Sequence, residues 1–170
     1  MPAPVDLPQN FARSPAGRLE SIQISNGGVP KLPVFGVALI TRDGVAGDRQ
    51  RNLKYHGGPD RAICLLSQEI IESLRKDGHP IARGTTGENL TISGLDWPLL
   101  QNGVRLSVGD VVLEITQAAH PCRNIAGSFA DGDFSGLSAK LHPGRARMYA
   151  RVIVPGSVQA GDPVRRLETP

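Results

Sequence analysis

The feature that most constrains the fold of this chain is a succession of short β-like runs separated by turns. The chain carries 20 glycines and 14 prolines, which supply the turns that so many short strands need. The runs fall at residues 18–25, 35–40, 62–67, 89–93, 104–108, 110–116, 148–154 and 163–167. Closing the sheet would pair the edges that such strands otherwise leave open. The sequence therefore predicts a mainly β fold with a few short helices, built as a closed or nearly closed antiparallel β-barrel.

Two short helices are expected between these runs. Ser67 can cap a helix over residues 68–77, because the isoleucines and the leucine that follow it share one face, and Gly78 ends the pattern. A weaker helical pattern runs through residues 134–141.

The length and composition favour a single domain that handles a small ligand. Residues 1–16 are rich in proline and alanine and predict a flexible N-terminal arm, while residues 17–170 form the domain. No apolar run approaches the roughly 20 residues of a membrane span, and no secretory signal opens the chain, so we expect a cytoplasmic protein without a membrane partner. The net charge of +3 favours small anions, and the low aromatic content of 4% argues against a nucleic-acid partner.

The densest polar segment, residues 47–62, is a candidate anion-binding loop. Its candidate ligand-binding residues are Arg49, Lys54, His56, Gly57, Gly58 and Arg61. Glycines let a ligand approach the backbone closely, and guanidinium and ammonium groups complement oxyanions. The segment lacks a Walker motif and a dinucleotide fingerprint, and a solvated loop with incidental charge is the alternative. Glu88 and Asn89, at the start of the run 89–93, are a second candidate, with a plain turn as the alternative.

Cys122 is the residue with the most reactive chemistry. It follows a proline after the run 110–116, outside the apolar stretch, so we expect it to be accessible. His120 and Arg123 stand beside it, and positive charge stabilises a thiolate, which metal ligation, persulfide formation and nucleophilic attack all require. Cys64 lies among isoleucine and leucine and is expected to be buried and inert. The two cysteines show no zinc-finger spacing, and a reducing compartment would keep both reduced.

Four segments, taken in order, resemble the MOSC domain, which is named after the C-terminal part of molybdenum cofactor sulfurases. They are GVAGDRQRNLKYHGGPDRAICLLS, TTGENLTISGLD, VGDVVLEITQAAHPC and YARVIVPGSVQAGDPV, and the resemblance covers roughly residues 17–167. It implies a barrel-like β fold with a cleft for the molybdenum cofactor (molybdopterin), a pterin carrying a phosphate. The 47–62 segment, Glu88 and Asn89 would line that cleft. At the position of Cys122, family members carry a cysteine that ligates molybdenum in some and is proposed to carry a persulfide in others.

The chain departs from the family pattern next to this cysteine. Many members carry an arginine two residues before the proline of the Pro-Cys pair, where this chain has Ala119. The resemblance therefore implies that the anion contact is either missing or supplied by His120 or Arg123.

Three functions follow from the resemblance. The first is an oxidoreductase that reduces N-hydroxylated compounds, with Cys122 as molybdenum ligand and electrons from a separate reductase. The second is a sulfur-carrier or cofactor-handling protein that receives sulfur from a donor as a Cys122 persulfide. The third is a non-catalytic module that binds another anion. The pattern leaves the oligomeric state open.

Overall fold

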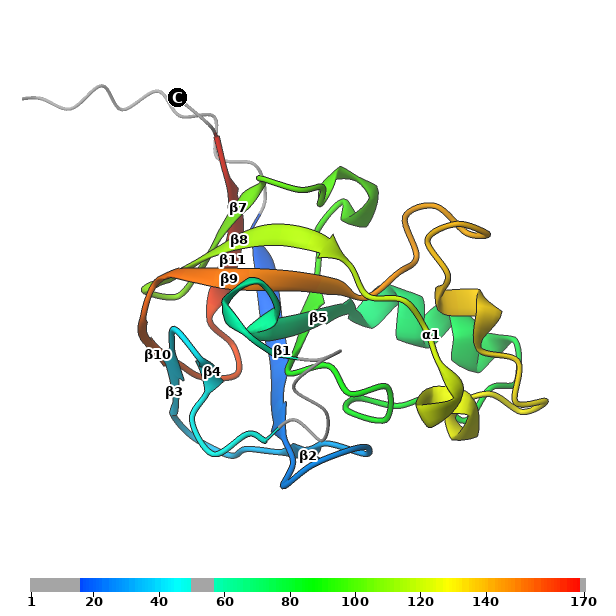
Figure 1. Ribbon diagram of the computed structural model, residues 1–170. Helices are drawn as coiled ribbons and strands as arrows, with labels where there is room; N and C mark the ends of the chain where they lie inside the picture. Colours follow the sequence, from blue (N-terminus) through cyan, green and yellow to red (C-terminus); the bar gives the residue numbers. More distant parts are fainter. Residues whose placement is uncertain (1–15, 50–56, 169–170) are drawn as a thin grey trace, which may run out of the picture.

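Seven strands close into a barrel in the computed structural model, which describes residues 16–49 and 57–168 (Figure 1). They are β1 (Gly17–Ile24), β5 (Ile63–Ser67), β6 (Leu90–Ser93), β7 (Arg105–Val108), β8 (Val111–Ala118), β9 (Met148–Val154) and β11 (Pro163–Leu167). The sheet runs in the order β11-β7-β8-β9-β5-β6-β1, and pairing of β1 with β11 closes it. A short strand β2 (Leu32–Pro33) pairs with the end of β1. The predicted closed, mainly β architecture is confirmed.

One pairing corrects the prediction of a wholly antiparallel barrel. Strands β5 and β6 run parallel, with Leu65 opposite Leu90. Parallel neighbours need a crossover connection, and helix α1 (Gln68–Lys76) with the loop after it provides one.

A small second sheet lies beside the barrel. It contains β10 (Gly156–Val158), β3 (Ala38–Thr41) and β4 (Gly44–Val45), in that order. The expected strand over residues 35–40 begins only at Ala38, because Gly36 has a φ of +82° and bends the chain just before it.

The first predicted helix is present, whereas the prediction of a second helix is wrong. Helix α1 begins after Ser67, whose hydroxyl accepts the N–H of Ile70. In the segment 134–141 only a 3₁₀ turn, Phe134–Leu137, forms. The Ser138 hydroxyl there accepts the N–H of Leu141, and such a local bond competes with helix continuation. Further 3₁₀ turns span Pro59–Arg61, Trp97–Leu99 and Arg123–Ser128.

Removing the cap of α1 is expected to cost about 1 kcal/mol of stability. In Ser67→Ala the Ile70 N–H loses its acceptor, and the Ser67 hydroxyl no longer donates to Glu69 at 2.9 Å. Urea unfolding followed by circular dichroism measures the change. Ser157→Ala, at an exposed position of β10, is the control and should leave the midpoint unchanged. Equal midpoints for the two variants would contradict the assigned cap.

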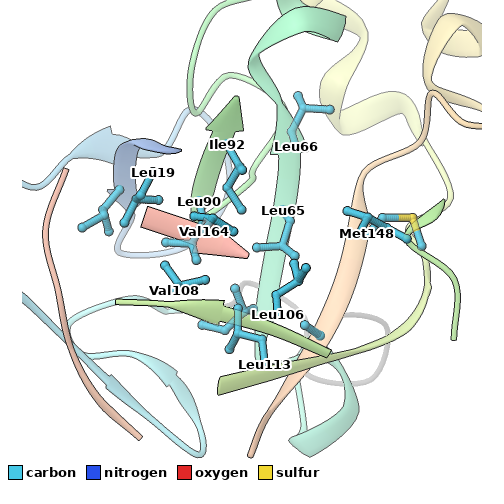
Figure 2. Packing of buried hydrophobic residues seen from close by; sticks show 14 of the residues in the cluster. Leu19, Leu65, Leu66, Leu90, Ile92, Leu106, Val108, Leu113, Met148 and Val164 are labelled. Carbon is cyan, nitrogen blue, oxygen red and sulfur yellow. The ribbon is translucent and has the colours of Figure 1, made fainter. Parts of the chain in front are cut away.

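Aliphatic side chains from different strands fill the barrel (Figure 2). Leu65, Leu90, Leu106, Leu113 and Val164 come from five strands, and each is at most 1% exposed. Each buried leucine contributes about 1.5–3 kcal/mol relative to exposure. The core therefore holds the strand ends, and the loops that extend from them, in fixed positions.

The predicted arm, residues 1–16, lies outside the described part of the chain except for Ala16. Among residues 16–49 and 57–168, no helix combines the length and the apolar character needed to cross a membrane.

Candidate functional site

A cavity of about 280 Å³ lies between the loops at one end of the barrel. Its wall contains both thiols, three cations, two amide side chains and a phenol. These residues are Cys64, Cys122, Lys31, Arg49, Arg147, Asn89, Asn124 and Tyr149. Reactive sulfur, positive charge and hydrogen-bond donors thus share one concave site.

Cys122 lies on the wall of this cavity, half-buried and in the free thiol form. It directly precedes the 3₁₀ turn Arg123–Ser128, and its carbonyl oxygen accepts the N–H of Ile125 at 3.1 Å. The backbone bond fixes the residue at the start of the turn while the thiol remains partly accessible.

Cys64 lines the same cavity from the barrel side, in β5. It is 6% exposed, and burial raises the pKa of its thiol to about 11. Its backbone exchanges two hydrogen bonds with Asn89: the Cys64 N–H donates to Oδ1 at 3.0 Å, and the Asn89 N–H donates to the Cys64 carbonyl at 2.8 Å. Cys64 is therefore a structural thiol at the edge of the site.

The two thiols are expected to differ in their rates of alkylation. With a pKa near 11, only about one Cys64 side chain in a thousand is a thiolate at pH 8, and it is also shielded from solvent. Iodoacetamide at pH 8, followed by peptide mass spectrometry, should label Cys122 more than about tenfold faster than Cys64. In urea the two rates should converge. Equal rates in the native protein would contradict this difference in accessibility.

Lys31 reaches the cavity from the loop between β1 and β2 and is held by a buried ion pair. Its Nζ lies 2.5 Å from Asp48 Oδ2, and the two side chains are only 8% and 5% exposed. Asp48 also accepts the Ser25 N–H and the side-chain amide of Asn89, both at 2.9 Å. This carboxylate thus neutralises Lys31 and joins three segments beneath the site.

Arg49 and Arg147 bring positive charge that no ion pair among the described residues offsets. The Arg49 side chain is exposed, and its backbone N–H donates to the Ser25 carbonyl at 2.8 Å. Arg147 is 6% exposed and donates to the backbone carbonyls of Thr86 and His120. Sequence reasoning missed Arg147, since it is one of several arginines near the run 148–154 and no motif distinguishes it.

The prediction that Glu88 lines the cleft needs correction. Glu88 is 0% exposed and does not contact the cavity. Its carboxylate accepts the Gly84 N–H and, at 2.6 Å, the Thr86 hydroxyl. Burial raises the pKa of Glu88 despite these bonds. The turn folds over the carboxyl group, so Glu88 shapes the loop, whereas its neighbour Asn89 reaches the cavity.

Five of the remaining predicted binding residues are described by the structure and do not line the cavity. Gly57 and Gly58 are not among the residues of the cavity wall. Arg61 lies behind the wall, with its guanidinium carbon 5.9 Å from the ring centroid of Tyr149. The side chains of His120 and Arg123 are exposed and do not line the wall, whereas Ala119, which precedes His120, is buried. Lys54 and His56 lie outside the described residues.

Within the described ranges, no three His, Cys, Asp or Glu side chains gather in a group able to hold a metal ion. Of the predicted site residues in these ranges, Arg49, Asn89 and Cys122 meet at the cavity.

Comparison with known proteins gives a family match and several relatives. The family model described as MOSC domain matches residues 52–165. The chain is 29% identical over 140 residues to YiiM of Escherichia coli, covering 80% of this chain and 62% of that protein. It is 26% identical over 176 residues to a protein named Reductase from Gibberella moniliformis, covering 99% of this chain and 31% of that protein. The chain therefore spans less than two thirds of the length of these curated relatives.

A solved structure has the same fold. The crystal structure of YiiM from Geobacillus stearothermophilus superposes with a TM-score of 0.72 at 23% identity, covering 89% of this chain and 75% of that chain.

Proposed function

Because the chain belongs to the MOSC domain family, we propose that it binds the molybdenum cofactor and reduces N-hydroxylated compounds, with Cys122 as a ligand of the metal. The observation that carries this proposal is the half-buried free thiol of Cys122 on the wall of a cation-lined cavity. The name of the fungal relative, Reductase, supports reductive chemistry.

The residues present fit a phosphate-bearing cofactor with a soft metal. Thiolates are soft ligands, and the sulfur of Cys122 lies where a ligand can reach it. Arg49 and Arg147 provide charge for a phosphate without competing carboxylates among the described ion pairs. The volume of about 280 Å³ is close to the lower end of the range of about 300–1,000 Å³ typical of ligand pockets.

When bound, the cofactor would supply the exchange of two electrons. The chain's own residues would hold the metal through Cys122, bind the anionic part of the cofactor and orient the substrate. Burial raises the pKa of Tyr149 to about 12, so its phenol stays protonated at neutral pH and can donate a hydrogen bond inside the cavity. Reduction of an N–OH group to N–H consumes two electrons and two protons and releases water. A separate reductase would deliver the electrons.

A sulfur-carrier function is the second candidate, favoured by the accessibility of the Cys122 thiol. A persulfide needs one accessible thiolate and no further side-chain ligand, and the described residues form no cluster of metal-ligating groups. In that reaction the Cys122 thiolate attacks the outer sulfur of a donor persulfide, and the donor thiolate leaves. A cytoplasmic location, where thiols remain reduced, suits both functions.

Metal and pterin analysis tests the proposal. The protein, purified from a molybdenum-replete host, should contain molybdenum by plasma mass spectrometry, together with the fluorescent oxidation product of the pterin, in equal amounts. Protein that contains neither and cannot be reconstituted would exclude the oxidoreductase. Sulfur released by cyanide from such metal-free protein would support the carrier, and the lack of both would leave the anion-binding module.

A further inference from the structure

The guanidinium of Arg147 is a buried cation without a carboxylate partner. Arg147 lines the cavity, is 6% exposed and forms no ion pair with a described residue. Taking a charge out of water is costly unless an opposite charge or full hydrogen bonding compensates it. A guanidinium in this setting is therefore suited to receive an anion.

The hydrogen bonds of Arg147 orient the group but leave its charge and several donors available. Nη1 donates to the Thr86 carbonyl at 2.5 Å and Nη2 donates to the His120 carbonyl at 3.2 Å. An arginine has five N–H donors, and its Nε is buried with no partner among the described residues. The nearby Glu88 carboxyl bonds to Gly84 and Thr86 instead, and burial disfavours its charged form.

Arg147 stands opposite Ala119 at the end of the β8–β9 ladder. Ala118 pairs with Met148, and one step further the Ala119 N–H donates to the Arg147 carbonyl at 2.8 Å. Opposite residues of an antiparallel pair carry their side chains on the same face, with Cβ atoms about 4.5–5.5 Å apart. An arginine at either position can thus bring its guanidinium to the same region beside Cys122.

We propose that Arg147 anchors an oxyanion subsite beside Cys122. The ligand is a phosphate-like group, whose charge matches the guanidinium and whose several oxygens accept from it. Asn124 lines the same cavity and adds an amide donor. Only the identity of the occupant rests on the proposed function: the subsite would hold the phosphate of the cofactor, not that of a free ligand.

Binding of inorganic phosphate tests the subsite without the cofactor. Calorimetric titration of the cofactor-free protein at low ionic strength should detect binding, and Arg147→Gln should raise the Kd by about tenfold or more. Arg145→Gln is the matched control, because Arg145 lies two residues away and donates to the exposed Ser73 hydroxyl. Arg145→Gln should bind as the wild type does. Absence of binding by the wild-type protein, or wild-type affinity in Arg147→Gln, would overturn the proposal.

An exchange of side chains across the ladder tests whether the position of the guanidinium, and not the residue that carries it, forms the subsite. Arg147→Ala should lose phosphate affinity as Arg147→Gln does, and the double variant Ala119→Arg/Arg147→Ala should recover it to within about threefold, since the guanidinium returns from the facing position. Urea unfolding confirms that each variant is folded, and Arg147→Lys keeps the charge should the alanine variant not fold. Loss of binding in the double variant, with the fold intact, would refute the exchange.

Two further experiments test the subsite independently of the proposed function. Cys122→Ser should retain phosphate binding, since the thiol is not part of the subsite, so a protein that never takes up molybdenum can still confirm the role of Arg147. Protein loaded with cofactor should no longer bind phosphate when the cofactor phosphate fills the subsite. Continued binding by loaded protein, still lost in Arg147→Gln, would assign the subsite to a free oxyanion.

Discussion

Cys122→Ser is expected to lower the molybdenum content of the purified protein by more than about tenfold. Even substitution of a residue that only hydrogen-bonds to a metal ligand reduces the affinity for the metal by about 10–100-fold. A serine oxygen is a hard donor and a weaker acid than a thiol, so it matches a soft metal less well than a thiolate does. Plasma mass spectrometry on wild-type and variant protein from the same host measures the difference. Under the proposed function, reduction of N-hydroxylated substrates should fall in parallel.

Cys64→Ser is the matched control for this experiment. It removes a thiol from the same cavity, but that thiol is 6% exposed and burial raises its pKa to about 11. Molybdenum content should therefore remain near the wild-type level in Cys64→Ser. Wild-type molybdenum and pterin in Cys122→Ser would rule out Cys122 as the ligand. Sulfur releasable by cyanide that disappears only in Cys122→Ser would assign the persulfide function instead.

Local sequence signals were sufficient to predict most of the barrel. Ser67 and Gly78 flank α1 as expected, because capping depends on residues within one turn of the helix end. The run 148–154 matches β9 at both ends, as its apolar side chains match the pattern of a buried strand. The parallel pairing of β5 with β6 was not predicted, since strand direction depends on where a crossover returns the chain. Strands as short as Gly44–Val45 carry too few residues to show a pattern.

The residues of the site were likewise predicted only in part. Cys122 was predicted to be accessible from its neighbours alone, and it lies half-buried on the cavity wall. Arg147 was missed because its contact with His120 joins residues 27 positions apart across the β8–β9 ladder. Glu88 is placed in the cleft by the resemblance to the MOSC pattern, whereas the turn at Gly84 folds over its carboxylate. The sequence thus indicates which groups are present, and the barrel decides which of them meet.

Asp48→Ala is expected to lower the free energy of unfolding by about 3–5 kcal/mol, the usual effect of breaking a buried ion pair by removing one partner. The change leaves the Lys31 ammonium buried and unpaired. It deprives the Ser25 N–H of its acceptor and the Asn89 amide of one of its two acceptors. Lys31 lines the cavity, and without Asp48 its charge is no longer neutralised, so the phosphate affinity of the folded protein should rise. Urea unfolding at constant pH gives the stability, and titration with inorganic phosphate gives the affinity.

The double variant Lys31→Met/Asp48→Ala separates the unpaired charge from the lost hydrogen bonds. It removes the buried ammonium, so it should be more stable than Asp48→Ala alone, with the remaining loss due to the Ser25 and Asn89 donors. A double-mutant cycle that includes Lys31→Met gives the coupling energy between the two side chains. A coupling near zero, or a loss below about 1 kcal/mol in Asp48→Ala, would mean that water solvates this pair. A large coupling energy would show that the Lys31–Asp48 ion pair beneath the cavity stabilises the fold. Because Lys31 is then neutralised, Arg49 and Arg147 are the cavity cations that remain available to a ligand.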